Sequence, residues 1–433
     1  MNPSVEIHLW GNRIGILYQG DNDPVPVFEY DRDFQDSGIE LAPFKMPLSD
    51  RLYSFPELMA SEAFHGMPGL IADSLPDKFG NAVIRRWLSN MGRSPDGMTP
   101  LERLYYTGTR GMGALEYIPA DETKATENIE ITALTELASE ILSERERARY
   151  DVDEMTMMQM MEIGSSAGGS RAKAVIAWNQ DTGEVRSGQI DPPPGFDQWL
   201  IKFDNVRGNG DYGEKDGKQY TLIEYAYYLM AKECGIDMSE CRIMEKDGMS
   251  HFMTRRFDRA GRKKVFTQTL AALGHYDFNE PGSCSYETYA GYARKLGIGA
   301  SGVEEIFRRM TFNVLSANCD DHVKNFSFIM DRQGRWSLSP AYDLTFAYNP
   351  NNRWLREHQM TVNGKSRGIT DEDLIESGRS MGLGTRFCRE TIRDVRGVVS
   401  EWRFFAGRCG IESSTVDAIG TVIDRSGPQM RAM

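Results

Sequence analysis

The chain has 433 residues, of which 40% are hydrophobic and 26% are charged, and its formal net charge is −13. This length predicts two or three domains or lobes, and the acidic balance argues against a broad nucleic-acid or membrane surface. No apolar run is long enough to span a bilayer, and the N-terminus lacks the pattern of a signal peptide. Six scattered cysteines show no zinc-site spacing, so we expect a protein of the reducing cytoplasm.

The N-terminal part begins with strands. Apolar alternation around the turn Gly11-Asn12 predicts a hairpin over residues 5–18, and a further strand over 25–30 carries Pro26, which favours a sheet edge. Amphipathic patterns then predict helices over 78–91 and 132–147. We expect the glycines of 107–115 to serve close packing, and we place a first subdomain at 1–150.

A loop rich in glycine and serine follows at 164–173 and enters a strand at 174–178. Bare backbone N–H groups and hydroxyls in such a loop suit phosphate oxygens, and Lys173 could reach a triphosphate. Because the loop enters a strand, it is not a Walker A motif. The alternative is a flexible surface hairpin loop, which is the commoner role for this composition.

The strand predicted at 198–204 places Lys202 in an apolar setting. A buried lysine is costly unless an anion meets it, and in a kinase that anion is a phosphate, with a helix carboxylate such as Glu224 behind the lysine. The alternative is an edge-strand lysine that points to water. A hairpin over 242–258 then ends at a predicted lobe boundary, which gives a nucleotide-binding part at 151–257 and a helical lobe at 258–433. The helices expected there cover 286–296, 303–317, 371–381, 386–405 and 414–423.

The strongest chemical signal lies at 318–325, Asn-Cys-Asp-Asp-His-Val-Lys-Asn, with Asp343 further on. Phosphoryl transfer needs a carboxylate that accepts the proton of the attacking hydroxyl, and an amide oxygen and a second carboxylate that hold Mg²⁺. Asp320 is predicted as the base, and Asn325 and Asp343 as metal ligands. Lys324 could meet the charge that develops on the transferred group. The alternative is an acidic, solvated loop.

The surrounding pattern supports this interpretation. The helix predicted at 303–317 leads into the loop, and two short strands at 326–330 and 336–339 flank the turn 331–334. The order helix, Asp loop, hairpin, Asp is that of a protein-kinase active centre, although no Phe-Gly pair follows Asp343.

Five stretches of the chain resemble one family. They are Gly-Ser-Ser-Ala-Gly-Gly-Ser-Arg-Ala-Lys at 164–173, Leu-Ile-Lys-Phe at 200–203, Arg-Arg-Phe-Asp-Arg at 255–259, Asp-Asp-His-Val-Lys-Asn-Phe-Ser at 320–327 and Ser-Pro-Ala-Tyr-Asp-Leu at 339–344. They are similar to the HipA-like serine/threonine kinases, the toxins of bacterial type II toxin–antitoxin systems. The resemblance implies an α+β, bilobal protein-kinase-like fold of the HipA type, with a β-rich N-terminal lobe, an all-helical C-terminal lobe, and the use of ATP with Mg²⁺.

The resemblance also implies roles for single residues. Asp320 is similar to the family's catalytic aspartate, and Asn325 and Asp343 to its metal ligands. Ser166 resembles a serine whose autophosphorylation ejects the Gly-rich loop from the ATP site, and Ser165 and Ser170 are alternatives. The implied nucleotide contacts are Gly168, Gly169, Ser170, Arg171, Lys173, Lys202, Arg255, Phe257, His322, Asn325 and Tyr342.

The implied partners are a small DNA-binding antitoxin of the HipB type and a protein substrate of the aminoacyl-tRNA synthetase class. DNA would be met only through the antitoxin, and no membrane partner is expected. One alternative is a nucleotide-binding corepressor scaffold that acts with its antitoxin and has little catalysis. Another is a small-molecule or lipid kinase on the same fold.

Overall fold

A computed structural model describes residues 4–20, 22–94, 98–120, 129–142, 154–164, 171–189, 193–206 and 219–426. The chain divides into two compact units. The first comprises residues 1–218, 242–268 and 272–275, and the second comprises residues 219–241, 269–271 and 276–433. Within the described ranges, no helix combines the length and the apolar character that crossing a bilayer requires.

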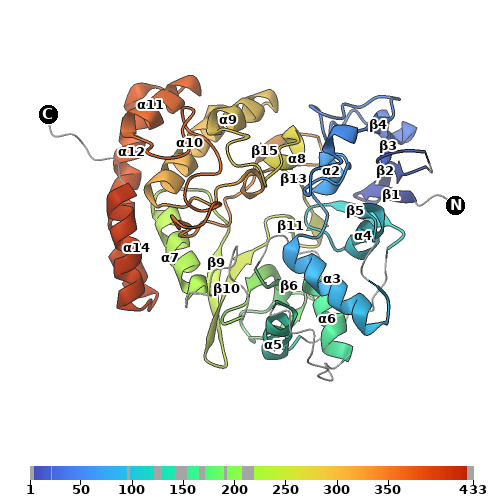
Figure 1. The fold of residues 1–433 in the computed structure, drawn as a ribbon, viewed down its shortest axis with the longest axis horizontal. Coiled ribbons are helices and arrows are strands. Elements are labelled where there is room, and N and C mark those ends of the chain that lie inside the picture. The colour runs from blue at the N-terminus through green and yellow to red at the C-terminus, as the bar shows by residue number, and fades with distance from the viewer. Residues whose placement is uncertain are drawn as a thin grey trace. The chain divides into compact units, whose positions relative to one another are not determined.

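The first unit begins with a five-stranded sheet in the order β4-β3-β2-β1-β5 (Figure 1). The predicted N-terminal hairpin is confirmed, since Leu9 pairs with Asn12 and Val5 with Leu17 across an antiparallel ladder. The strands are β1 (Ser4–Leu9), β2 (Asn12–Tyr18), β3 (Val27–Tyr30), β4 (Tyr53–Ser54) and β5 (Leu115–Ile118). Short helices accompany this sheet: α1 (Arg32–Gln35), η1 (Pro56–Leu58), α2 (Gly69–Ala72) and α4 (Pro100–Thr107).

A second sheet of the same unit has the order β7-β6-β8-β10-β9. Its strands are β6 (Lys173–Trp178), β7 (Val185–Ser187), β8 (Asp197–Lys202), β9 (Cys241–Lys246) and β10 (Met249–Arg255). Helices α3 (Lys78–Asn90), α5 (Ile131–Leu142) and α6 (Glu154–Gly164) form one apolar core with it. Phe79 and Trp87 of α3, predicted as its inward side, meet Trp199 and Ile201 of β8 in that core. Lys202 therefore ends a central strand, which makes the edge-strand alternative wrong.

Short strands follow in the chain, β11 (Arg259–Ala260), β12 (Lys263–Lys264) and β13 (Phe266–Thr269), and then α8 (Leu270–Gly274). Helices dominate the second unit, where α10 packs against α9 and α12, and α13 packs against α7 and α14. The predicted hairpin after residue 325 is confirmed, with Phe328 opposite Leu338. The elements are α7 (Tyr220–Glu233), α9 (Tyr286–Lys295), α10 (Ala300–Leu315), η3 (Val323–Asn325), β14 (Ser327–Met330), β15 (Trp336–Leu338), α11 (Asp371–Ser380), α12 (Thr385–Ser400), α13 (Trp402–Arg408) and α14 (Ser413–Ser426).

Two expectations differ from the structure, and one helix was not expected. Pro26 does not mark an edge strand, because β3 pairs with both β2 and β4; the proline precedes the strand, where no ladder N–H is needed. The helix expected over 386–405 is two helices that meet at Glu401, and the turn lets Trp402 donate its indole N–H to the carbonyl of Val416 at 2.9 Å. Helix α6 was not predicted, and its residues Met157, Met160 and Met161 lie in the core of the first unit.

Candidate active site

The loop that carries Asp320 begins where α10 ends. Ala317 has a φ of 56°, which turns the chain back, and the N–H of Asn318 bonds to the carbonyl of Asn313 at 3.0 Å. Two further bonds fix the loop to residue 347: Cys319 N–H donates to the Ala347 carbonyl at 3.0 Å, and Ala347 N–H donates to the Ala317 carbonyl at 3.2 Å. The residues before the predicted base are therefore held by backbone geometry.

Asp321, the neighbour of the predicted base, is fully buried and accepts three hydrogen bonds. The donors are Tyr286 Oη at 2.7 Å, the backbone N–H of Gln359 at 2.7 Å and His358 Nδ1 at 3.0 Å. Asp320, in contrast, is only partly buried. The two adjacent carboxylates thus differ in environment, since Asp321 is buried in the fold and Asp320 keeps part of its surface exposed.

Buried polar side chains continue this network behind the loop. Asn313 Nδ2 donates to Tyr286 Oη at 2.9 Å, and Asn318 Nδ2 donates to Asn313 Oδ1 at 3.0 Å. Burial, together with the negative charge of Asp321, raises the pKa of Tyr286 well above its usual range, so the phenol stays protonated and donates. Linked hydrogen bonds of this kind rigidify the backbone that they hold, although Asn318 Oδ1 accepts no bond from the described residues.

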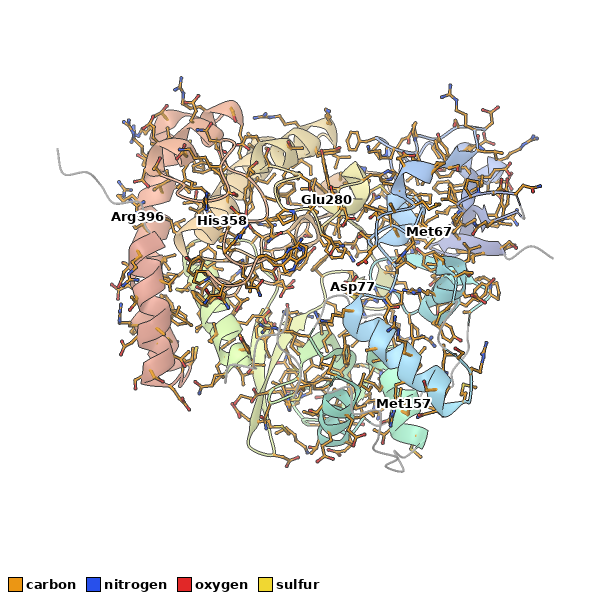
Figure 2. All side chains as sticks on the ribbon, in the orientation of Figure 1. Met67, Asp77, Met157, Glu280, His358 and Arg396 are labelled. Carbon is orange, nitrogen blue, oxygen red and sulfur yellow. The ribbon has the colours of Figure 1, made fainter. Side chains whose placement is uncertain are left out.

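His358 is the charged partner of Asp321 in this network, and it is labelled in Figure 2. Burial lowers the pKa of the imidazole, but the Asp321 carboxylate outweighs this effect, and the pKa of His358 lies well above its usual value. Cys319 Sγ lies 3.9 Å from His358 Nε2. The protonated ring therefore bridges the loop and the segment 354–359.

The raised pKa of His358 has a consequence for stability. The stabilisation by the charged ring is complete below about pH 6.5, the unfolded value, and is lost as the pH rises through the higher folded pKa. We expect His358→Gln to lower the free energy of unfolding by about 1–3 kcal/mol near pH 6, with a difference from wild type that shrinks toward pH 10. Urea unfolding curves at several pH values measure this difference. His8→Gln, in the first unit, is the control, and a His358→Gln deficit that is the same at every pH would contradict the expectation.

Asn325, a predicted metal ligand, has its amide group oriented by the loop itself. Its Nδ2 donates to the backbone carbonyl of Asp320 at 2.8 Å. This bond fixes which end of the amide is nitrogen, and it leaves Oδ1 as the atom that can face a cation. An oxygen of this kind is the ligand that Mg²⁺ prefers, so the donor set fits the group that the sequence implies.

Asp343, the second predicted ligand, follows the hairpin β14–β15. Tyr342 Oη lies 2.7 Å from the Lys324 carbonyl, to which it donates, and 2.5 Å from Ser327 Oγ. Asn325 directly follows Lys324, and Asp343 directly follows Tyr342. The hydrogen bond between Tyr342 and Lys324 therefore brings both predicted ligands to the same end of the hairpin. Asp343 has a φ of 57°, a left-handed conformation that non-glycine residues adopt at some cost and that is often found at functional sites.

Lys324 and His322 share an aromatic neighbour. Lys324 Nζ lies 4.9 Å from the centroid of the Phe278 ring, and the His322 ring lies 5.8 Å from the same ring. A cation over an aromatic face is stabilised without losing its charge. The structure thus brings Asp320, His322, Lys324, Asn325, Tyr342 and Asp343 together on one loop and one hairpin of the second unit.

The first unit carries the lysines predicted to contact phosphates. Lys173 and Lys202 are directly opposite each other on β6 and β8, so both side chains lie on one face of the sheet. Their exposed fractions are 4% and 7%, and Lys202 Nζ lies 5.8 Å from the centroid of the Phe252 ring. A lysine that is buried on a sheet needs an anionic or polar partner, and phosphate oxygens are one such partner.

The other predicted nucleotide contacts in this unit lie at or near the ends of the strands. Arg255 ends β10, is exposed, and bonds to Asp197 at 2.5 Å, while Arg171 and Phe257 are partly buried. The predicted carboxylate Glu224 is buried on α7 of the second unit, and its role stays a prediction. Gly168, Gly169, Ser170 and the candidate phosphorylation sites Ser165 and Ser166 lie outside the described residues.

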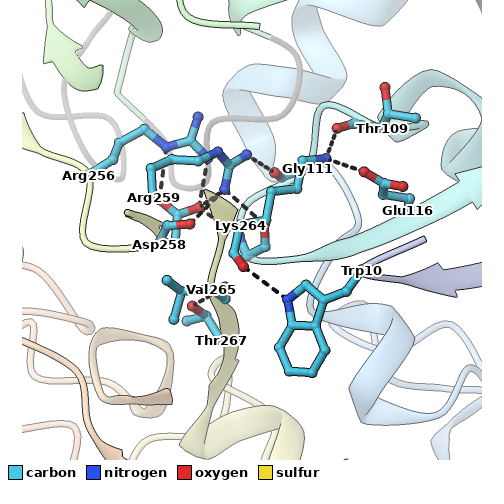
Figure 3. A network of polar contacts seen from close by, with 11 residues as sticks. Trp10, Thr109, Gly111, Glu116, Arg256, Asp258, Arg259, Lys264, Val265 and Thr267 are labelled. Carbon is cyan, nitrogen blue, oxygen red and sulfur yellow. Dashed lines mark hydrogen bonds and ion pairs between the residues drawn. The ribbon is translucent and has the colours of Figure 1, made fainter. Parts of the chain in front are cut away.

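The structure also shows a buried ionic network that the sequence does not reveal. Arg256 Nε and Nη2 bond to the two oxygens of Asp258 at 2.9 and 2.7 Å, and Arg259 Nη1 bonds to Asp258 Oδ2 at 2.8 Å (Figure 3). Asp258 also accepts the backbone N–H of Gly113 at 2.7 Å. Burial raises the pKa of Asp258, but the two arginines outweigh it and hold the pKa well below its usual range.

Comparisons with known proteins add to this geometry. A family model described as the HipA-like C-terminal domain matches residues 165–402, and one described as the HipA N-terminal domain matches residues 5–118. The whole fold is similar to that of a chain in the solved complex of the Shewanella oneidensis MR-1 toxin–antitoxin system HipA, HipB and its operator DNA. The TM-score is 0.68 at 16% identity, and the match covers 98% of this chain and 96% of that chain. At this identity the likeness is one of fold.

Two curated relatives match a smaller part of the chain. A Sinorhizobium fredii protein named "Putative kinase Y4dM" is 30% identical over 148 residues, and a Haemophilus influenzae protein with the same kind of name is 29% identical over 167 residues. The matches cover 29% and 34% of this chain, and 35% and 49% of the relatives' own lengths. The aligned part of this chain thus spans less than half the length of each of these relatives.

Proposed function

Because the chain belongs to the HipA family, we propose that it is an ATP-dependent protein serine/threonine kinase and the toxin of a type II toxin–antitoxin system. The observation that carries the proposal is the orientation of Asn325, whose amide nitrogen donates to the Asp320 carbonyl while its oxygen remains for a cation. A solvated acidic loop would not need a buried network behind Asp321 or a side chain so oriented. The α+β fold with two units agrees with this function.

The chemistry assigns a separate task to each side chain. Asp320 accepts the proton of the acceptor serine hydroxyl. At the same time, the serine oxygen forms a bond to the γ-phosphorus, and the bond from that phosphorus to the leaving ADP oxygen breaks. Lys324 lies on the same loop, where its positive charge offsets charge that develops on the transferred group. Asn325 Oδ1 and the Asp343 carboxylate would hold Mg²⁺, which, when bound with ATP, neutralises phosphate charge.

The nucleotide contacts are proposed on the strands and loops already described. Lys173 and Lys202 would bind phosphate oxygens, since they lie opposite each other on one face of the sheet and both match the family's nucleotide contacts. The remaining proposed contacts are Gly168, Gly169, Ser170, Arg171, Arg255, Phe257, His322 and Tyr342. Ser166, with Ser165 and Ser170 as alternatives, is the proposed autophosphorylation site, where a phosphate would add negative charge to the loop.

The proposed partners follow from family membership and from the solved relative. That structure holds HipA with HipB and operator DNA, and we propose a similar small DNA-binding antitoxin for this chain. The proposed substrate is a translation enzyme of the aminoacyl-tRNA synthetase class, and the proposed location is the bacterial cytoplasm.

Labelled ATP tests this function directly. The purified chain is incubated with γ-labelled ATP and either Mg²⁺ or excess EDTA, alone and with a desalted lysate. We expect label on serine in protein, in the chain itself and in an added acceptor, and no label in EDTA, because the phosphate charge is then not neutralised. Label in a small-molecule or lipid fraction would make it a kinase with another acceptor. ATP binding without any transfer would favour the corepressor scaffold.

A further inference from the structure

The first unit contains a pocket that shares only Arg255 with the proposed nucleotide contacts. Its volume is about 200 Å³, and it lies where the loop before β8 meets the end of β10 and the β11–β12 turn. The residues that line it are Pro193, Pro194, Phe196, Asp197, Gln198, Arg255, Arg256, Arg259, Gly261 and Arg262. Four of these ten residues are arginines, in a chain whose net charge is −13.

The charges around the pocket do not balance. Arg255 is paired with Asp197 at 2.5 Å, and Arg256 and Arg259 share the single carboxylate of Asp258 (Figure 3). Arg262 is exposed at the rim. Among the described residues, four guanidinium groups against two carboxylates leave an excess of two positive charges.

One buried donor in the wall has no hydrogen-bond partner within the part of the chain that the structure describes. Arg256 is 4% exposed, and its Nη1 is buried without a hydrogen-bond acceptor among the described residues. An unsatisfied buried donor is costly, and a charged one more so, which makes an anionic acceptor favourable. Arg259 agrees with this interpretation, because burial and the nearby charge of Arg256 together lower the pKa of Arg259 to about 10 in spite of the opposing effect of Asp258.

The size and the walls of the pocket restrict the ligand. Pockets for whole nucleotides or drug-sized molecules usually hold about 300–1,000 Å³, so 200 Å³ suits a smaller group. Planar guanidinium groups match the oxygens of a phosphate in a bidentate manner. Pro193, Pro194 and Phe196 add an apolar wall, and the Arg186 guanidinium lies 5.1 Å from the centroid of the Phe196 ring. A phosphate on a short organic stem fits both features.

The pocket differs from the nucleotide contacts proposed above. Lys173, Lys202 and Phe257 do not line it, and Arg255 is the residue shared with that set. We propose that this arginine pocket binds a phosphate monoester, either free or carried on a serine side chain, and that it does so independently of ATP. The proposal does not depend on the kinase activity, since a chain without catalysis would still contain the pocket.

Equilibrium binding with phosphate probes tests the proposal. Inorganic phosphate, O-phosphoserine and a phosphoseryl peptide are titrated into the full-length chain, with the unphosphorylated peptide as the negative probe. We expect the phosphorylated probes to bind and Arg262→Gln to weaken them about tenfold, the value of one charge-assisted hydrogen bond. Lys263→Gln, a neighbouring exposed position with the same charge change that does not line the pocket, should bind like wild type.

The result separates the possible sources and the possible failures. Equal affinity for inorganic phosphate and O-phosphoserine would identify a free anion as the ligand, and tighter binding of the peptide would identify a phosphoprotein; both support the pocket. Equal losses in Arg262→Gln and Lys263→Gln would overturn it, because they indicate nonspecific charge attraction. Displacement of phosphate by an ATP analogue at stoichiometric concentration would also overturn it, because the phosphate would then occupy the nucleotide site.

Discussion

Asp320→Asn is expected to slow phosphoryl transfer by about a hundredfold or more, the usual contribution of a positioned general base. Asparagine keeps the shape of the side chain but does not accept the serine proton. The backbone carbonyl that orients Asn325 is unchanged by this substitution, so the proposed metal ligand keeps its geometry. The loss should therefore appear in kcat, while the KM for ATP stays close to the wild-type value.

Two further variants make this result specific. Asp394→Asn changes an exposed aspartate that pairs with Arg393 at 2.9 Å, and it should transfer phosphate like wild type. Asp321→Asn removes charge from the buried acceptor of three donors, so it should lower the urea midpoint as well as the activity. If Asp320→Asn retained the wild-type rate with a normal fold, Asp320 would not be the base.

Asp258→Asn is expected to destabilise the first unit by about 3–5 kcal/mol, the cost of leaving buried charges without their partner. The Arg256 side chain is 0% exposed and the Arg259 side chain 7% exposed, and both depend on this one carboxylate. The amide that replaces it can accept a hydrogen bond, but it cannot compensate two positive charges. Urea unfolding of the variant and the wild type at pH 7 measures the difference.

A surface pair serves as the comparison for Asp258. Glu184 bonds to Arg186 at 2.7 Å with side chains that are 39% and 26% exposed, and Glu184→Ala should change the free energy of unfolding by about 1 kcal/mol or less. A loss of similar size for Asp258→Asn would mean that the arginines find other acceptors or water. The network would then contribute little to the stability of the first unit.

Much of the fold could be predicted from local pattern. The helix α3 shows its apolar side at a regular spacing, and the hairpins β1–β2 and β14–β15 show alternation around a turn. The division of 386–405 into α12 and α13 was not predictable in this way, because the apolar stripe from Cys388 to Trp402 continues across the break. At the break, Trp402 makes a tertiary hydrogen bond to the carbonyl of Val416, which local pattern does not reveal.

The motif of the candidate site could be predicted from the sequence, but the buried residues that hold the motif in place could not. Asp320, Asn325 and Asp343 share a short stretch of sequence with a recognisable spacing. Tyr286 and His358 lie far from them along the chain, and an isolated tyrosine or histidine gives no signal of the carboxylate that it will meet. The arginine pocket is similar, since Pro193 and Arg262 come together only through the order of the strands.

The contacts of Lys264 and Arg259 determine how this protein can be dissected. Lys264 Nζ bonds to Glu116 at 2.7 Å and to the Thr109 carbonyl at 2.5 Å, and Arg259 Nη1 bonds to the Gly113 carbonyl at 2.9 Å. A fragment that begins after residue 150 would lose these acceptors and keep the cations. The N-terminal portion is consequently no detachable module, and a soluble nucleotide-binding fragment would have to retain residues 109–116 or replace the basic side chains that rely on them.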